Sequence, residues 1–329
     1  MKEITRAPAQ YFPFMSGVFE VAAGLRQFGT DFGNKELDQK LIQIDSEFYK
    51  YRENKTKCRE ENIHKYCCSH RFGTEKQSHL VAFLSAKVCE EYPEYFRLRE
   101  EAQSKILNCA LTQEELHFDT HWNLLESSKT SLKYLNAFDA LCSQIQEDVA
   151  LLTLEQVEGV QKNYLSAVHL CAAGHWSPED KIGKDFFAVH TPVPHIEKIN
   201  ERAQQFADMM VHKGPFVRFV WGFSTDTRLN HHPVAPQGID SKTWHGRSFQ
   251  DPKRDQLFVR VERQVTWGLP EINSGLFTIR VSYLKGEEIL KDPEKKQKLL
   301  ESIQSMSPHS KKYKGLETSY ETLCKYLES

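Results

Sequence analysis

Charged and amide side chains lie within one run of strand-forming residues, 257–270. Arg260, Glu262 and Gln264 alternate there with valines, so an extended chain places the three polar side chains on one face and the valines on the other. Arg263 falls in the apolar register, where a guanidinium needs a partner or a ligand. The alternative is an edge strand, on which Arg263 lies half in water and has no role.

Arginines recur on the strands that the sequence predicts. Arg218, Arg260, Arg263 and Arg280 could bind carboxylate or phosphate groups, which a guanidinium contacts through two parallel hydrogen bonds. The two propionates of a haem are such carboxylates. The alternative is a charged outer face, on which Glu262 pairs with a neighbouring arginine across strands. The residues alone leave both readings open.

His190 ends a short apolar run, residues 186–189, and Thr-Pro-Val-Pro follows it, in which two prolines fix the backbone. A rigid and apolar setting suits a histidine that presents one imidazole nitrogen to a metal ion or a haem iron. The alternative is a histidine that only hydrogen-bonds a carbonyl at a turn.

The remaining histidines and cysteines form no common motif. His231 and His232 are adjacent, so their side chains point apart in an extended chain, and they lie in a long polar loop, residues 226–254. The cysteines and histidines between 58 and 70 match no zinc spacing, and Cys-x-x-Cys-His is absent from the sequence. The sequence also lacks a serine nucleophile elbow, a P-loop, a Rossmann glycine pattern and His-Glu-x-x-His.

Composition narrows the class of protein. The chain has 329 residues, a net charge of -2 and eight cysteines, which we interpret as reduced thiols of a cytoplasmic protein. The near-neutral charge predicts no nucleic-acid partner. We expect no membrane span, because no run of 18 apolar residues occurs, and the N-terminus lacks the apolar core of a signal peptide.

Hydrophobic periodicity predicts two kinds of region. About the first 145 residues are expected to be mainly helical, and strands dominate from Asp148 onwards. This order argues for the α+β class. The expected helices are 34–48, 75–90, 95–107, 112–125, 129–141 and 196–211, with a charged helical tail after 285, and the expected strands are 149–154, 164–171, 186–189, 216–223 and the hairpin 257–270/275–283.

Several motifs, in this order and spacing, resemble those of one family. They are Gln146-Glu-Asp-Val-Ala-Leu-Leu152, Trp176-Ser-Pro-Glu-Asp-Lys-Ile-Gly183, Val189-His-Thr-Pro-Val-Pro194, Arg218-Phe-Val-Trp221, Arg260-Val-Glu-Arg-Gln264, Leu269-Pro270 and Phe277-Thr-Ile-Arg280. With them the chain resembles the haem-dependent oxidative N-demethylase family, typified by the haem subunit of dimethylamine monooxygenase. The resemblance covers roughly residues 40–285.

The resemblance implies a fold and a cofactor. It implies an α+β fold with a PAS-like antiparallel sheet, in which residues 1–145 form a largely helical N-terminal region, 146–285 the PAS-like haem-binding sheet domain and 286–329 a charged helical tail. It also implies that His190 is the axial ligand of the iron in a b-type haem (heme b). Arg218, Arg260 and Arg263 would then neutralise the propionates or shape the distal side.

The resemblance further implies an activity. The chain would be a haem-dependent monooxygenase that uses O2 to oxidise a small secondary or N-substituted amine. Glu262, Gln264 and Asp148 would orient the substrate amine or a bound water, and a cationic amine favours a nearby carboxylate. No nucleotide or iron–sulfur motif is present, so electrons should come from a separate reductase.

Departures from the family pattern leave the substrate open. Val220 stands where the family usually has asparagine, and Ala172-Ala-Gly-His175 replaces a stretch that usually ends in Pro-Ser. The sequence therefore leaves two other functions open. One is a haem-PAS sensor or carrier that binds a gas or an amine without turnover, and the other is a binding protein that has kept the fold and lost the haem.

Overall fold

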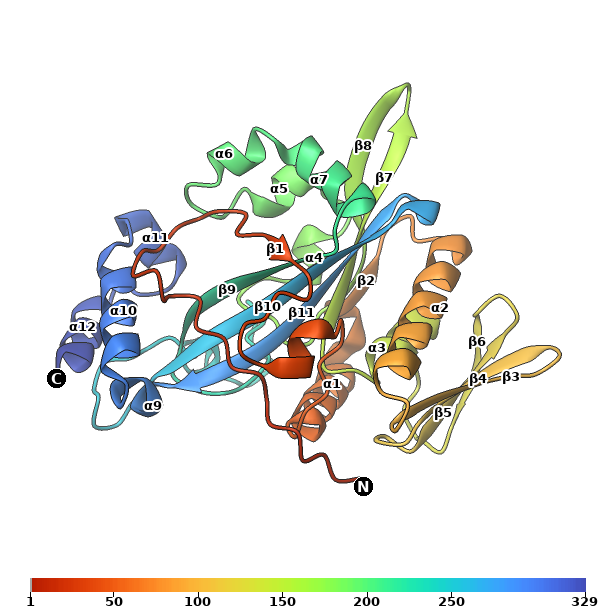
Figure 1. Ribbon diagram of the computed structural model, residues 1–329, viewed down its shortest axis with the longest axis horizontal. Helices are drawn as coiled ribbons and strands as arrows, with labels where there is room; N and C mark the ends of the chain where they lie inside the picture. The colour runs from red at the N-terminus through yellow and green to blue at the C-terminus, as the bar shows by residue number, and fades with distance from the viewer. Residues whose placement is uncertain (1) are drawn as a thin grey trace.

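An antiparallel sheet of seven strands forms the centre of the computed structural model, which describes residues 2–329 (Figure 1). Its strand order is β1-β9-β10-β11-β7-β8-β2. The sequence-based strands 149–154, 164–171 and 216–223 and the hairpin are thereby confirmed. The bounds are β1 Arg26–Gln27, β2 Cys67–Ser69, β7 Asp148–Val157, β8 Val160–His169, β9 Phe216–Ser224, β10 Phe258–Leu269 and β11 Ser274–Lys285.

The β10–β11 hairpin pairs along its whole length, from Phe258 opposite Lys285 to Leu269 opposite Ser274. Val259, Val261 and Val265 are buried on one face of the hairpin, where a pleated and packed surface favours β-branched residues. A 3-10 helix, η3 Pro270–Ile272, makes the turn together with Asn273, whose φ of 48° lies in the left-handed region that asparagine tolerates. The long and continuous pairing fixes which side chains share a face.

Helix α7, Ala203–His212, covers one face of the sheet, which we call the α7 face. A Cβ added to Gly268 would lie 2.2 Å from the carbonyl oxygen of Val211, and one added to Gly275 would lie 2.8 Å from that of Met210. Glycine at these two positions lets the helix backbone approach the sheet. Because side chains alternate along a strand, Gln264 lies on the same face as Gly268.

The opposite face, which we call the N-terminal face, is covered by residues 4–45 and by the C-terminal helices. Figure 1 shows the N-terminal segment crossing in front of β10 and β11. Tyr11 packs there on Phe219 of β9, with ring centroids 4.5 Å apart. The C-terminal helices are α9 Gly286–Leu290, α10 Pro293–Gln304, α11 Pro308–Tyr313 and α12 Tyr320–Glu328.

Short helices connect β8 to β9. They are α4 Pro178–Lys181, α5 Phe186–His190, α6 Glu197–Asn200 and α7. The strand predicted for 186–189 is therefore wrong. The carboxylate of Asp185 accepts a hydrogen bond from the N–H of Ala188 at 2.7 Å and so caps a helix. An apolar run this short carries no periodicity that separates a strand from a helix.

The N-terminal region holds a second antiparallel sheet, seen at the right of Figure 1. The helices predicted for 95–107 and 112–125 are wrong, because these segments form its strands. Thr112, expected to begin a helix, instead donates its hydroxyl proton to Gln144 at 2.6 Å. The alternating burial of Leu116 and Phe118 is the period of a strand. The strands are β3 Phe96–Glu100, β4 Ser104–Cys109, β5 Glu114–Asp119 and β6 Leu124–Ser128.

The first predicted helix, 34–48, is also wrong. The buried carboxylate of Asp38 accepts hydrogen bonds from the N–H groups of Phe32 and Asn34 and from the hydroxyl of Tyr11, which holds this segment in turns. The helix predicted for 129–141 is limited to α3. The remaining elements are η1 Lys35–Gln39, α1 Phe48–Asn62, η2 Ile63–Lys65, α2 Thr74–Glu91, α3 Ala137–Cys142 and α8 Ser241–His245.

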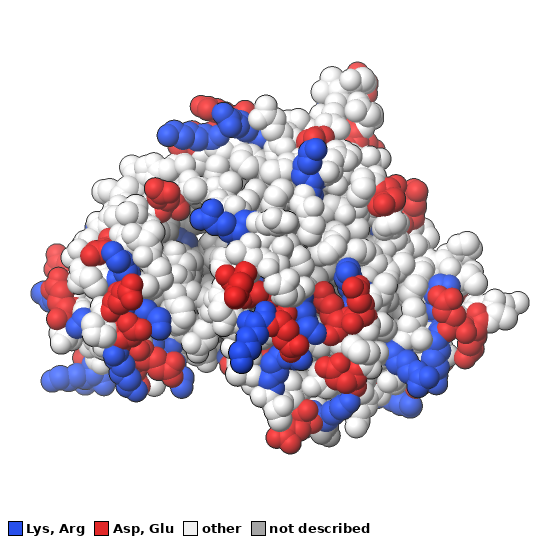
Figure 2. Space-filling view, in the orientation of Figure 1, with Lys and Arg blue, Asp and Glu red and all other residues white. Residues whose placement is uncertain are grey.

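The predicted α+β class is confirmed, since the chain combines many helices with two antiparallel sheets. Within residues 2–329 no helix is both long enough and apolar enough to cross a lipid bilayer. Acidic and basic side chains are interspersed over the face seen in Figure 2, so that face carries no broad region of one sign.

Candidate functional site

The α7 face brings together four of the predicted site residues. Arg260, Glu262 and Gln264 follow one another at alternate positions of β10, and Arg218 lies opposite Gln264 on β9. Arg260 and Gln264 both contact Glu262: the guanidinium of Arg260 forms an ion pair with the carboxylate, and the amide nitrogen of Gln264 donates to it at 2.8 Å. Sequence alternation therefore predicted this row correctly.

Arg260 is fixed from two sides. Its second terminal nitrogen donates to the carbonyl oxygen of Ala172 at 2.7 Å. A Cβ at Gly174 would lie 2.5 Å from Arg260, so only glycine leaves room for the guanidinium. Burial opposes its charge, but the adjacent carboxylate of Glu262 raises the pKa of Arg260. Arg260 therefore stays protonated, and Glu262 is already neutralised by it.

Two further cations reach this face from distant parts of the chain. Lys314, at the end of α11, donates to the carbonyl oxygen of Trp221 on the free edge of β9 at 2.6 Å. Arg247, in the loop after β9, donates to the carbonyl oxygen of Tyr313 at 3.4 Å. Both residues were missed by sequence reasoning, because a polar loop and a charged tail carry no pattern that assigns their side chains to a site. We call Arg218, Arg247, Arg260 and Lys314 the cationic cluster.

Arg218 differs from Arg260, Arg263 and Arg280 in having no partner. Among residues 2–329, no hydrogen bond or salt bridge joins its guanidinium to another group. Burial lowers the pKa of Arg218, and the nearby Glu262 acts against this shift. Arg218 also lies close enough to His190, at the end of α5, for its charge to lower the pKa of that imidazole. Three of the four predicted cofactor residues, His190, Arg218 and Arg260, thus lie on the α7 side of the sheet.

His190 is held by its own helix. The Nδ1 atom lies 2.7 Å from the carbonyl oxygen of Phe186, and the ring packs on that of Phe186 with centroids 4.2 Å apart. Because a carbonyl only accepts, Nδ1 carries the proton and Nε2 keeps its lone pair. Burial is the main cause that lowers the pKa of His190, so the imidazole is neutral near pH 7.

Arg263 and Asp148 lie apart from this row. Arg263 is on the N-terminal face, where it donates to the carbonyl oxygen of Lys40 at 2.9 Å and lies over the ring of Phe28. Asp148 is buried at the start of β7, and its carboxylate accepts hydrogen bonds from the N–H groups of Cys171 and Ala172 at 2.8 and 2.7 Å. Asp148 therefore positions the segment whose carbonyl holds Arg260.

Asp148 also belongs to the one group of three metal-type donors that the described residues bring within 4.8 Å of one another, with His169 and Cys171. His169 is bonded to the carboxylate of Asp139 at 3.2 Å. The cysteines and histidines between 58 and 70 do not form such a group. His231 and His232 do not share a partner either: His231 contacts Asp226 at 3.0 Å, and His232 contacts the backbone of Val234.

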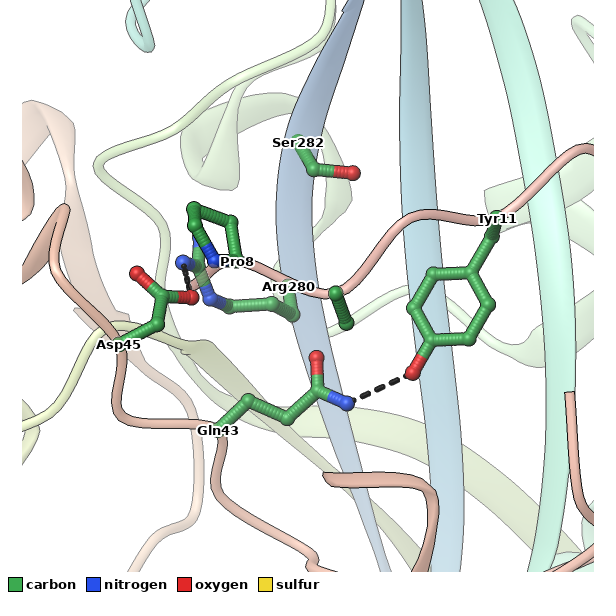
Figure 3. A pocket seen from close by; sticks show the side chains of 7 residues that line it. Pro8, Tyr11, Gln43, Asp45, Arg280 and Ser282 are labelled. Carbon is green, nitrogen blue, oxygen red and sulfur yellow. Dashed lines mark hydrogen bonds and ion pairs between the residues drawn. The ribbon is translucent and has the colours of Figure 1, made fainter. Parts of the chain in front are cut away.

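The N-terminal face contains a narrow pocket that Figure 3 shows from close by. Pro8 and Tyr11 of the N-terminal segment lie over it, and Arg280 of β11 forms an ion pair there with Asp45 at 2.6 Å. The amide nitrogen of Gln43 donates to the hydroxyl of Tyr11 at 2.7 Å. Arg280, one of the strand arginines of the sequence, thus has a partner within the chain.

The family comparison covers most of the chain. Residues 33–324 match the model of a family described as haem-dependent oxidative N-demethylase, alpha subunit-like. That description is of an oxidoreductase, and the match extends beyond the motif-bearing part of the sequence to the α12 helix. It includes the α5 histidine, the β10 row and both cations of the loop and tail. The chain therefore belongs to the haem-dependent oxidative N-demethylase, alpha subunit-like family.

Proposed function

We propose that this chain is a haem-dependent monooxygenase that removes an N-methyl group from a small secondary or N-substituted amine. The observation that carries the proposal is His190, a neutral imidazole whose Nδ1–H is fixed by a carbonyl and whose Nε2 is free to bind iron. Axial histidines are commonly oriented in this way by a hydrogen bond from the other ring nitrogen. Family membership supports the same conclusion.

The cationic cluster fits the rest of a haem. A b-type haem is bound without a covalent link to the chain, and its two propionates need positive partners. Arg218 has no partner among the described residues and lies close enough to His190 to affect its pKa. Apolar side chains for the porphyrin are available on the same sheet face, where Phe277 and Ile279 of β11 lie beside Trp176. The residues present therefore fit the group.

Bound haem would supply the centre at which O2 is reduced. In the net reaction, a secondary amine, O2, two electrons and two protons give a primary amine, formaldehyde and water. We propose that a separate reductase provides the two electrons, and that the reaction takes place in the cytoplasm. The chain itself provides binding, orientation and exclusion of water.

Gln264 and Glu262 are proposed to orient the substrate. The amide nitrogen of Gln264 donates to Glu262, so the amide oxygen of Gln264 is left to accept an N–H of the amine. Arg260 holds the Glu262 carboxylate in place. Asp148 acts at one remove, through the backbone of Ala172. We therefore assign Asp148 as a positioning residue.

The central sheet supports the proposal of a PAS-like core for residues 146–285. Its five strands β7 to β11 lie in the order β8-β7-β11-β10-β9, so the first and last strands are neighbours and the helices α4 to α7 form the connection between the second and the third. We propose that residues 1–145 and 286–329 pack on this core as flanking regions.

An absorption spectrum of the purified protein with haem tests the proposal. We expect a Soret band that shifts when CO is added to the reduced protein. In His190→Ala the band should be lost or displaced. His195→Ala is the matched control, because His195 lies five residues further on, is exposed and contacts Ser307 and His309 of the C-terminal region. Product analysis with a reductase then separates demethylation from N-oxidation, and binding without any product would favour a sensor.

A further inference from the structure

The inference below rests on the proposed function and concerns its substrate. The α7 face holds more positive than negative charge around the proposed site. Arg218, Arg247 and Arg260 all lie close enough to Lys314 to lower its pKa, and the carboxylate of Glu262 acts on it in the opposite sense. Since Arg260 and Glu262 already neutralise each other, three positive charges are left over.

These surplus charges are only partly satisfied. Lys314 is 9% exposed, and Arg218 and Arg247 are half-buried. The Nε atoms of Arg247 and Arg260 are buried and have no hydrogen-bond partner among residues 2–329. The Lys314 ammonium has three protons and donates to one carbonyl. A buried charge without a counter-ion is costly, so a folded site of this kind awaits an anion.

The pKa of Lys314 reports the same imbalance. Burial lowers it from the usual value to about 8. Glu262 acts against this shift, while Arg247, Arg260 and Arg218 add to it. An anion bound beside these groups would raise the pKa of Lys314 again.

Haem alone does not balance the cluster. Its two propionates would compensate two of the three surplus charges and leave one cation without a partner. A simple dialkylammonium ion would add a further positive charge to this site. The carboxylates once expected to receive it are both engaged, Glu262 by Arg260 and Asp148 by two backbone N–H groups.

We propose that the substrate is an N-methylated amine that also carries a carboxylate, as an N-methyl amino acid does, and that Lys314 and Arg247 bind this carboxylate. The two residues come from the tail and from the long loop, and these segments pack together. Arg247 donates to the carbonyl oxygen of Tyr313, and a Cβ at Gly315 would lie 2.6 Å from the Arg247 side chain, so both chain neighbours of Lys314 contact Arg247. The substrate amine then faces Gln264. Charge-assisted bonds of this kind favour the anion strongly over a neutral isostere.

Isothermal titration calorimetry of the ferric haem protein at pH 7 tests the proposal with three probes. These are N-methylglycine, its analogue N-methylglycinamide, in which a neutral amide replaces the carboxylate, and dimethylamine. We expect N-methylglycine to bind about tenfold or more tightly than either of the others. Equal binding of N-methylglycine and its amide would overturn the proposal without reference to any variant.

Substitutions test whether Lys314 and Arg247 cause the preference for the carboxylate. Lys314→Met and Arg247→Met should each abolish most of the preference for N-methylglycine over its amide and leave dimethylamine binding unchanged or improved. Lys312→Met is the matched control, because Lys312 is an exposed lysine of the same helix. Circular dichroism checks that each variant is folded. If either folded variant kept the full preference, the assignment of that residue would be wrong.

The experiment also distinguishes the two proposals. If the Soret band depends on His190 but N-methylglycine and its amide bind equally well, the haem function would stand and the proposed substrate class would be wrong. A protein without such a band would overturn the haem function. The calorimetric comparison is still informative for that protein. Tighter binding of N-methylglycine than of its amide would support the anion site, and equal binding would contradict it.

Discussion

The two faces of the central sheet both carry buried arginines, but they treat the charge differently. On the N-terminal face, Arg280 forms an ion pair with Asp45, and Arg263 donates a hydrogen bond to the carbonyl oxygen of Lys40. Glu147 is a second buried acidic residue there. Each of these two guanidinium groups therefore has a partner within the chain. On the α7 face the cationic cluster has one carboxylate for four cations. The difference indicates that the first face serves the fold and the second serves a ligand.

The largest effect is expected where the chain supplies its own counter-ion. Asp45→Asn leaves the buried Arg280 without its carboxylate, and we expect the free energy of unfolding to fall by about 3–5 kcal/mol, as for other broken buried pairs. Urea denaturation measures it. Glu155→Gln breaks the exposed pair with Arg71 and should cost less than about 1 kcal/mol. Equal losses would contradict the assigned role of the Asp45 pair.

The next effect depends on pH. Burial raises the pKa of Glu147 from 4.5 to about 7, against the pull of Arg280. The folded state thus binds this proton more tightly than the unfolded state, so stability falls as pH rises from about 4.5 to 7. Glu147→Gln should therefore be more stable than the wild type at pH 8, by up to about 3 kcal/mol, and equal to it near pH 4.5. A difference independent of pH in denaturation curves would refute this.

A smaller effect of opposite sign is expected on the α7 face. Arg218→Met removes a half-buried cation that has no partner among the described residues, so the haem-free protein should gain about 1 kcal/mol of unfolding free energy, while haem binding weakens. Arg280→Met, on the other face, should instead lose stability. Denaturation and haem titration of both variants give the signs. Loss of stability in both would remove the distinction between the faces.

The smallest effect concerns the helix that carries His190. Asp185→Ala removes the N-cap of α5, which should cost about 1 kcal/mol and weaken haem binding because the imidazole is less well positioned. Asp292→Ala removes the equivalent cap of α10, and it should destabilise that helix without changing haem affinity. Haem titration separates the two, and equal haem affinity in wild type and Asp185→Ala would contradict a positioning role for this cap.

Sequence reasoning succeeded where a period of two extended over many residues. The strand alternation placed Arg260, Glu262 and Gln264 together, and the pairing of β10 with β11 followed from the turn residues. Lys314 and Arg247 were beyond its reach, because their place on the α7 face is set by the packing of a tail helix and a loop. No local pattern encodes such contacts.

The sequence-based prediction was wrong in the N-terminal sheet for a different reason. The strands β3 to β6 are short and rich in charged residues, so their helix-forming composition outweighed a brief alternation. The signal was present in β5, where Leu116 and Phe118 are buried and His117 between them is not. For residues 186–190, the signal for a helix was the capping residue Asp185, because the apolar run itself is too short to separate a helix from a strand.

The covering of the N-terminal face has a consequence for how the chain is made. The hydroxyl of Ser302 donates to the carbonyl oxygen of Phe14, 288 residues earlier, and Ser305 accepts from the N–H of Phe19. At ribosomal rates of about 5–20 residues per second, the first segment waits roughly 15–60 s for these contacts. Val259 of β10 is made only about 45 residues before Gln304 at the end of α10, so the valines of β10 lack cover from α10 for a much shorter time, roughly 2–9 s at the same rates.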